Sequence, residues 1–185
     1  MAQWLPGSAD FSLPLLQRIL AARGIAAPEE FCTPSWERGL HPATAFRDMA
    51  KAVARLRRAL QDRETVAIAG DYDVDGVAAA ALLVHLFRFL QAPDPVVLLP
   101  HRIRDGFGLT PQLVERAHAA GATLLITVDN GITAVEAVAR ATALGIGVII
   151  TDHHSPTGPL PAGMVGLIDP ALPDEPYPFD RRAGA

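Results

Sequence analysis

The sequence predicts an α/β domain in which a parallel sheet is covered by helices on both faces. From residue 65 onward, short runs rich in valine, isoleucine and leucine alternate with helical segments. This alternation is typical of parallel sheets whose strands are buried on both faces. The 185 residues are 50% hydrophobic and 19% charged, which is an ordinary globular composition for one domain with a short appendage.

Residues 1–60 are predicted to form a short helical region that leads into this domain. Apolar residues recur at helical spacing over residues 13–23, and Gly24 is then a suitable C-cap. Prolines 28, 34 and 42 interrupt the next stretch. A second, amphipathic helix is expected over residues 48–60, because its apolar residues share one face.

The domain itself is predicted to occupy residues 61–185. Strands are expected at residues 65–69, 95–99, 122–128, 147–151 and 164–168, and helices at residues 76–90, 111–120 and 134–144. Pro111 suits a helix start, and Gly145 suits a helix end. In a Rossmann-like sheet of this kind, ligands bind at the carboxyl ends of the strands, so the residues that follow strands are the candidate site.

Polar clusters follow three of the predicted strands. The first strand is followed by Asp71, Asp73 and Asp75, the strand at residues 122–128 by Asp129 and Asn130, and the strand at residues 147–151 by Asp152, His153 and His154. Three strand ends therefore deliver acids or histidines to one edge of the sheet.

The three acids of the first cluster repel one another unless a cation compensates their charge. Alternate positions on an extended loop point the same way, so Asp71, Asp73 and Asp75 could face one ion, and a solvated acidic turn is the alternative. A calcium EF-hand loop is rejected, because Leu82 stands where a bidentate glutamate is required. The run from Asp73 also resembles a haloacid-dehalogenase phosphatase signature, but the only lysine, Lys51, precedes it.

The other two clusters offer imidazole and carboxylate groups. Asp129 is either a turn residue or a carboxylate that bridges two metals. Adjacent side chains on an extended backbone diverge, so only one of His153 and His154 is expected to bind metal, and the other to contact a phosphate or the attacking water. Asp152 is a candidate to orient a histidine ring from behind. Together the clusters predict a two-metal site that hydrolyses phosphate esters or anhydrides.

Five ordered segments resemble the DHH phosphoesterase superfamily, and within it the RecJ exonucleases. They are GDYDVDG (residues 70–76), PHRIRDGFGL (100–109), TVDNG (127–131), IITDHH (149–154) and DEPYPF (174–179). The resemblance implies that two Mn²⁺ or Mg²⁺ ions are bound by Asp73, Asp75, Asp129 and His153. It implies catalytic positions at His154, Asp129 and Asp71, and a contact between Arg102 and DNA phosphate.

The same resemblance implies an enzyme that hydrolyses phosphodiester bonds in single-stranded DNA from the 5′ end, in DNA repair and recombination. Single-strand binding protein and a helicase are the implied protein partners. The net charge of −4 gives no overall attraction to nucleic acid. One cysteine and no recognisable signal peptide lead us to expect a cytoplasmic protein without a membrane span.

The chain differs from the family pattern at its end. By the resemblance, the family's fourth motif, its DHHA1 domain and its DNA-binding barrel would be expected to follow residue 185. We therefore expect an N-terminal fragment with weak or no activity alone. Two alternatives stay open: a DHH phosphodiesterase or pyrophosphatase acting on oligonucleotides, cyclic dinucleotides or pyrophosphate, and a non-catalytic RecJ-like binding module.

Overall fold

The computed structural model describes residues 12–25, 27–101 and 103–178, which fall into two compact units. The first unit, residues 1–41, contains three short helices: α1 (Leu15–Ala22), α2 (Pro28–Cys32) and α3 (Trp36–Gly39). Leu20 alone is buried among the described residues of this unit. The second unit, residues 42–185, contains the sheet and the remaining helices.

The division between the units falls at residues 41 and 42, earlier than the boundary at residue 60 that we expected. Helix α4 (Met49–Gln61) accounts for the difference, because it packs on the sheet. Its buried Ala52 and Ala59 contact the same core cluster as strand residues Ile68 and Ile149. The second expected helix is thus part of the α/β domain rather than of the lead-in.

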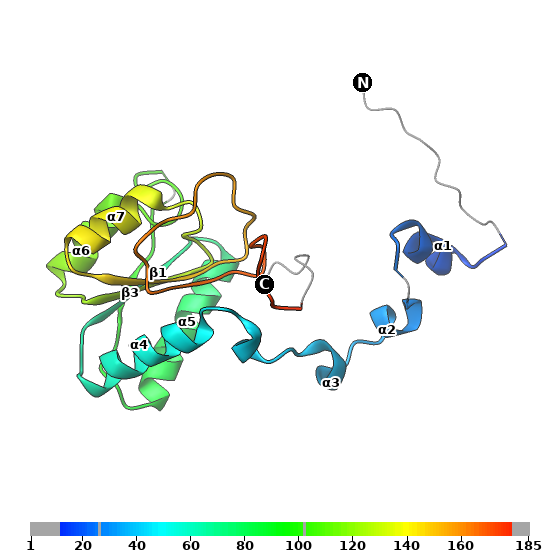
Figure 1. The fold of residues 1–185 in the computed structure, drawn as a ribbon, viewed down its shortest axis with the longest axis horizontal. Coiled ribbons are helices and arrows are strands. Elements are labelled where there is room, and N and C mark those ends of the chain that lie inside the picture. Colours follow the sequence, from blue (N-terminus) through cyan, green and yellow to red (C-terminus); the bar gives the residue numbers. More distant parts are fainter. Residues whose placement is uncertain (1–11, 26, 102, 179–185) are drawn as a thin grey trace, which may run out of the picture. The chain divides into compact units, whose positions relative to one another are not determined.

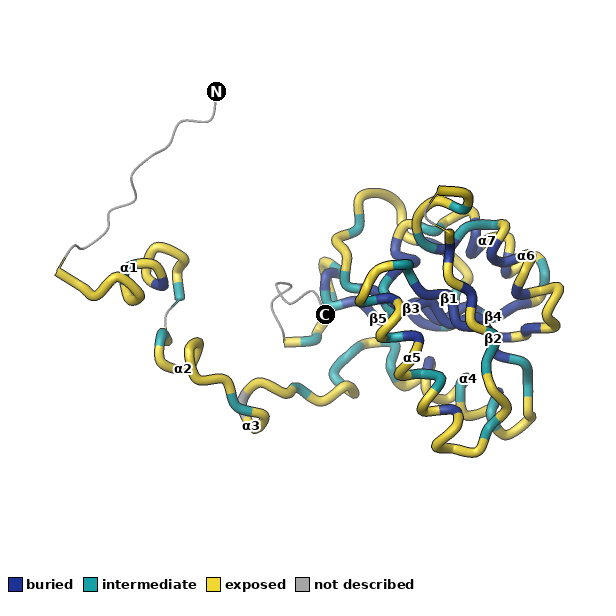
Figure 2. The backbone as a smooth tube through the Cα atoms, turned by 180° about the vertical axis from the view of Figure 1, so that it is seen from behind, coloured by how far each residue is buried: buried dark blue, intermediate teal, exposed yellow. Residues whose placement is uncertain are grey.

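A five-stranded parallel sheet forms the centre of the second unit (Figure 1), which confirms the predicted fold class. In sheet order its strands are β2 (Val96–Leu98), β1 (Val66–Gly70), β3 (Leu124–Val128), β4 (Gly147–Thr151) and β5 (Gly166–Ile168). Every residue of β1 and β3 is buried. Figure 2 shows the buried residues concentrated in this sheet.

Helices cover both faces of the sheet (Figure 1). Helices α4 and α5 (Val74–Phe89) pack on one face, and α6 (Pro111–Ala119) and α7 (Val135–Ala143) on the other. Side chains alternate between the two faces of a strand. Val66 and Ile68 therefore belong to the core beneath α4 and α5, whereas Ala67 and Ala69 belong to the core beneath α6 and α7. No helix in the described part of the chain has the length and hydrophobicity that a membrane crossing requires.

The order in which strands are added to the sheet reverses between the neighbouring strands β1 and β3. From β1 the chain passes to β2 on one side and then returns to β3 on the other side of β1. Such a switch point opens a crevice at the carboxyl ends of the two strands, where ligands of open α/β sheets bind. The acids Asp71 and Asp129 follow these two strand ends.

Candidate metal centre

The loop after β1 places Asp73 at the start of helix α5. Its carboxylate oxygen Oδ1 accepts hydrogen bonds from the backbone N–H groups of Asp75 and Gly76, both at 3.1 Å. These are N–H groups that have no partner within the helix, so the aspartate is a favourable N-cap. The bond from Gly76 is the main cause that lowers the pKa of Asp73, and the carboxylate is ionised at neutral pH.

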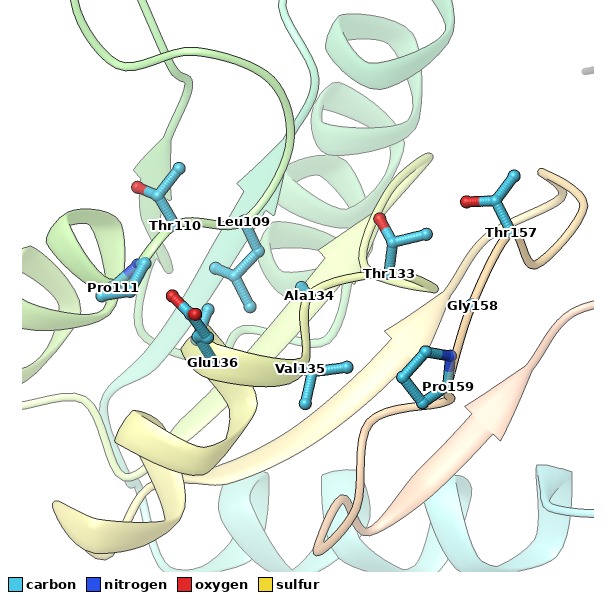
Figure 3. Close-up of a pocket in the computed structure, with 11 residues that line it drawn as sticks. Leu109, Thr110, Pro111, Thr133, Ala134, Val135, Glu136, Thr157, Gly158 and Pro159 are labelled. Carbon is cyan, nitrogen blue, oxygen red and sulfur yellow. The ribbon is translucent and has the colours of Figure 1, made fainter.

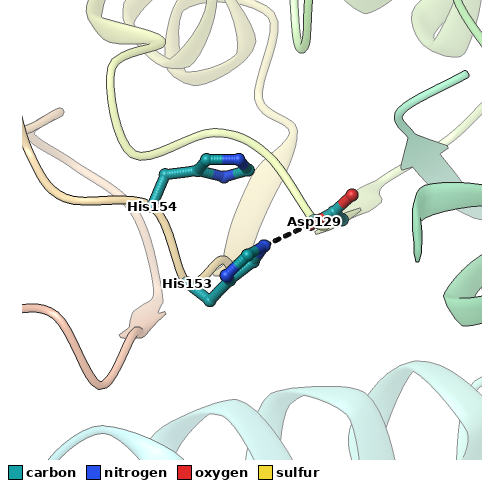
Figure 4. A group of neighbouring side chains, drawn as sticks. All are labelled: Asp129, His153 and His154. Carbon is teal, nitrogen blue, oxygen red and sulfur yellow. Dashed lines mark ion pairs between the residues drawn. The ribbon is translucent and has the colours of Figure 1, made fainter. Parts of the chain in front are cut away.

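Asp129 occupies the first position after β3 with a left-handed backbone, at φ 63°. This conformation is uncommon for residues other than glycine, although aspartate adopts it more readily than most. The Asp129 N–H donates to the Thr151 carbonyl at 3.0 Å, which joins the ends of β3 and β4. The side chain is only 6% exposed, and its Oδ1 lies 2.9 Å from His153 Nε2 (Figure 4).

Burial and a neighbouring acid both disfavour the charged form of Asp129. Burial raises its pKa most, and the negative charge of Asp73 raises it further, whereas His153 acts in the opposite direction. A buried carboxylate beside another carboxylate gains stability when a cation binds between them. The donor set of acids and imidazoles therefore suits a divalent metal.

Asp152 lies behind the histidines, with a side chain only 1% exposed. Its Oδ1 accepts from the N–H groups of His153 (2.8 Å) and His154 (3.1 Å), and lies 2.7 Å from His154 Nδ1. Its Oδ2 accepts from the Ile132 N–H at 2.9 Å. The hydrogen bond with Asp152 is the main cause that raises the pKa of His154.

The two histidine rings lie side by side, whereas we expected them to diverge. Their centroids are 4.4 Å apart and their planes are tilted by 41° (Figure 4). The reason is the Asp152 carboxylate: by accepting both following backbone N–H groups, it turns the chain after β4, and an extended geometry no longer applies. His153 and His154 can therefore both face the same ligand.

The structure brings most of the predicted residues into two overlapping groups. One group contains Asp129, His153 and His154, and the other contains Asp71, Asp73 and Asp129; within each, the potential ligand atoms all lie within 4.8 Å of one another. Asp129 belongs to both, as a carboxylate that bridges two ions would. Asp75 lies outside these groups but lines a hollow of about 310 Å³ with Asp129 and His153. Arg102 lies outside the described residues.

Sequence reasoning missed Asp169, which directly follows β5. It is fully buried, and its Oδ1 accepts from the Ala171 N–H at 2.7 Å, while Oδ2 has no hydrogen-bond partner among the described residues. Burial raises its pKa. The pairing of Thr151 with Ile168 brings Asp169 alongside Asp152 at the sheet edge. The sequence could have indicated Asp169, because it is an acid directly after a predicted strand, the same pattern that identified Asp129.

A hollow opens next to the acids, and a second hollow adjoins it. The first, of about 490 Å³, is lined by Asp71, Asp129 and His154 together with the loop residues Phe107 and Gly108. The second, of about 410 Å³, lies at the starts of helices α6 and α7 (Figure 3). They share four lining residues: Leu109, Thr133, Ala134 and Thr157. A substrate larger than a single phosphate therefore has space beside the candidate metal centre.

Known proteins resemble this chain over most of its length. The model of the DHH family, N-terminal domain, matches residues 65–175. The single-stranded-DNA-specific exonuclease RecJ of Escherichia coli is 40% identical over 171 residues, which are 92% of this chain and 29% of the relative. The RecJ of Thermus thermophilus is 33% identical over 168 residues, 86% of this chain and 25% of the relative. The chain thus spans about 30% or less of the length of these curated relatives.

Solved structures give the same result. A crystal structure of exonuclease RecJ bound to manganese matches with a TM-score of 0.64 and 34% identity, over 73% of this chain and 34% of that one. The structure of RecJ in complex with Mn²⁺ from Thermus thermophilus matches with a TM-score of 0.62 and 30% identity, over 84% of this chain and 21% of that one.

Proposed function

Because the chain belongs to the DHH family, we propose that its site uses two divalent ions, Mn²⁺ or Mg²⁺, to hydrolyse phosphodiester bonds in single-stranded DNA. The observation that carries this proposal is the pair of ligand groups that share Asp129. The digestion from the 5′ end, the role in DNA repair and recombination, the cytoplasmic location and the partnership with single-strand binding protein and a helicase belong to the same proposal. These last points rest on the resemblance to RecJ.

In this proposal, most side chains of the site hold the metals and one histidine contacts the phosphate. Asp71, Asp73, Asp129 and His153 hold the metals, and Asp75 joins them from the first turn of α5. When bound, the ions would activate a water molecule and stabilise the leaving oxygen. The ring of His154, whose pKa is raised, keeps its proton to a higher pH and can donate it in a hydrogen bond to a phosphate oxygen.

Asp152 does not touch the substrate in this scheme but positions the groups that do. Its hydrogen bond fixes His154 Nδ1, so that Nε2 is the ring nitrogen available to a ligand. Its two backbone bonds hold the turn that carries His153. Arg102 remains a prediction from sequence as a phosphate contact.

Metal binding is the first test. Calorimetric titration with Mn²⁺ should give two ions per chain, and Asp129→Ala should abolish both sites because Asp129 belongs to both ligand groups. Asp94→Ala is the matched control, since Asp94 is an exposed acid whose partner is Arg88. A chain that binds no Mn²⁺ would contradict the proposal and support a non-catalytic binding module.

Substrate choice is the second test. Because the chain spans only 29% of the Escherichia coli RecJ, its Mn²⁺-dependent release of nucleotides from 5′-labelled single-stranded DNA should be weak, and Asp129→Ala should abolish it. Turnover of pyrophosphate or cyclic dinucleotides in preference to DNA would leave the metal centre intact and overturn the proposed substrate.

A further inference from the structure

A large aromatic side chain is exposed beside the candidate metal centre. Phe107 lies in the loop between β2 and α6 and is 74% exposed. It lines the same hollow as Asp71, Asp129 and His154. A phenylalanine that stays in water forgoes a favourable burial, and here it does so next to a group of acids. The arrangement indicates a ligand with both a charged and a flat apolar part.

The loop that carries Phe107 rests on the strands of the metal centre. Phe107 stands between Gly106 and Gly108, which have φ values of 80° and 63°, a conformation that glycine adopts without strain. Gly108 sits on Asn130: a Cβ at Gly108 would lie 3.5 Å from the Asn130 Cβ. The buried Asn130 amide donates to the Ala69 and Val128 carbonyls at 3.0 and 2.9 Å, in β1 and β3.

Tyr72 supports Phe107 from one side. The ring centroids are 5.3 Å apart and the planes are tilted by 48°, a favourable geometry for an aromatic pair. Tyr72 lies between Asp71 and Asp73 in the chain, so the aromatic pair and the acids belong to one loop system. The position of Phe107 relative to the acids is therefore determined by short connections.

We propose that Phe107, supported by Tyr72, is a stacking platform for the base of the nucleotide whose phosphate lies at the metal centre. This inference rests on the proposed function. It also gives a reason for the site to prefer a nucleotide over pyrophosphate, because pyrophosphate has no base to stack on Phe107. Any base has a flat face, so such a platform binds without sequence preference. Phe107 acts on binding and takes no part in proton transfer.

The test compares a ligand that has a base with one that lacks it. Equilibrium dialysis of the Mn²⁺-loaded chain would measure the affinities for dAMP and for 2-deoxyribose 5-phosphate. Phe107→Ala should weaken dAMP binding by about 5- to 150-fold, the range typical of one aromatic–base stack, and leave the sugar phosphate and Mn²⁺ binding unchanged. Phe107→Trp should retain or tighten dAMP binding.

Phe89→Ala is the matched control. Phe89 is 83% exposed at the last position of α5, whose first turn faces the metal centre, so the same truncation there should change neither affinity. Equal affinities of the unchanged chain for the two ligands, or dAMP binding that is unaffected in Phe107→Ala, would overturn the platform while leaving the metal site intact. Absence of Mn²⁺ binding would instead overturn the proposed function. In that case, dAMP titrations of the unchanged chain and both Phe107 variants without metal would still test whether Phe107 stacks on the base.

Discussion

Replacement of Asp152 by asparagine changes one atom of a buried group that accepts four hydrogen bonds. Oδ1 faces three donors, from His153 N, His154 N and His154 Nδ1, and Oδ2 faces the Ile132 N–H. An asparagine has only one acceptor oxygen. If that oxygen takes the place of Oδ1, the amide NH₂ meets the Ile132 N–H, donor against donor.

The expected loss of stability follows from these contacts. An unsatisfied buried donor costs about 1–3 kcal/mol, and the change from a charged to a neutral acceptor weakens the bond to His154 by about 1 kcal/mol. Asp152→Asn should therefore lower the free energy of unfolding by about 3 kcal/mol. For a chain of this size, that corresponds to a fall in melting temperature of about 6–12 °C.

Urea unfolding followed by far-UV circular dichroism would measure this loss. Tryptophan fluorescence is unsuitable, because Trp4 and Trp36 both precede the α/β unit. Asp94→Asn, at an exposed ion pair with Arg88, is the control and should behave as the unchanged chain. Mn²⁺ affinity should also fall by about 10- to 100-fold, because the backbone hydrogen bonds to Asp152 hold the turn that carries the metal-binding His153. Stability within about 0.5 kcal/mol of the unchanged chain would refute the argument.

Three further predictions concern the same edge of the sheet. Gly131→Ala should destabilise the chain by about 3 kcal/mol or more in urea, because φ is 116° and the new Cβ would lie 2.8 Å from Thr127 Oγ1. The control Gly145→Ala, at φ 75° with nothing within 4 Å, should cost only about 1–2 kcal/mol. Equal losses of stability in the two variants would contradict the close contact at Gly131. Burial and Asp73 raise the pKa of Asp129, so the stability of the metal-free chain falls as pH rises through that pKa. Asp129→Asn should therefore raise the melting temperature of the metal-free chain at neutral pH and remove its stabilisation by Mn²⁺. A lower melting temperature of the metal-free variant would count against the reasoning. Asp152 raises the pKa of His154, so the stabilisation of the fold by protonated His154 is complete in acid and is lost as pH rises through the raised pKa. The difference in unfolding free energy between the unchanged chain and His154→Gln should shrink over that interval. A constant difference would show that protonation of His154 does not stabilise the fold.

The strand positions were predictable from sequence, because buried runs of branched residues between turn signals leave few alternatives. The sheet edge that carries Asp71 and Asp129 followed from the same pattern. Helix α5 was harder to delimit: it begins at Val74 rather than Gly76 because the Asp73 carboxylate caps it. The early start explains Asp75, which no longer follows the two-residue alternation of an extended loop and lies apart from Asp71 and Asp73.

The geometry of the histidine pair could not be obtained from local rules. An extended backbone separates neighbouring rings, but the Asp152 carboxylate turns the chain and brings the rings of His153 and His154 together. The burial of Asp169 depends on the pairing of β5 with β4, which no local pattern specifies. The closeness of Phe107 to Tyr72 is likewise a tertiary contact between two loops far apart in sequence.

The unequal burial of the two units predicts how their amide hydrogens exchange with solvent. Helices α1 to α3 contain one buried side chain among their described residues, Leu20, so little opposes their transient opening. Strands β1 and β3 are buried throughout and are flanked by other strands on both sides. Their amides exchange only when the whole sheet opens. Deuterium uptake should therefore be nearly complete in residues 12–25 and 27–41, while the strands that position Asp71 and Asp129 remain protected.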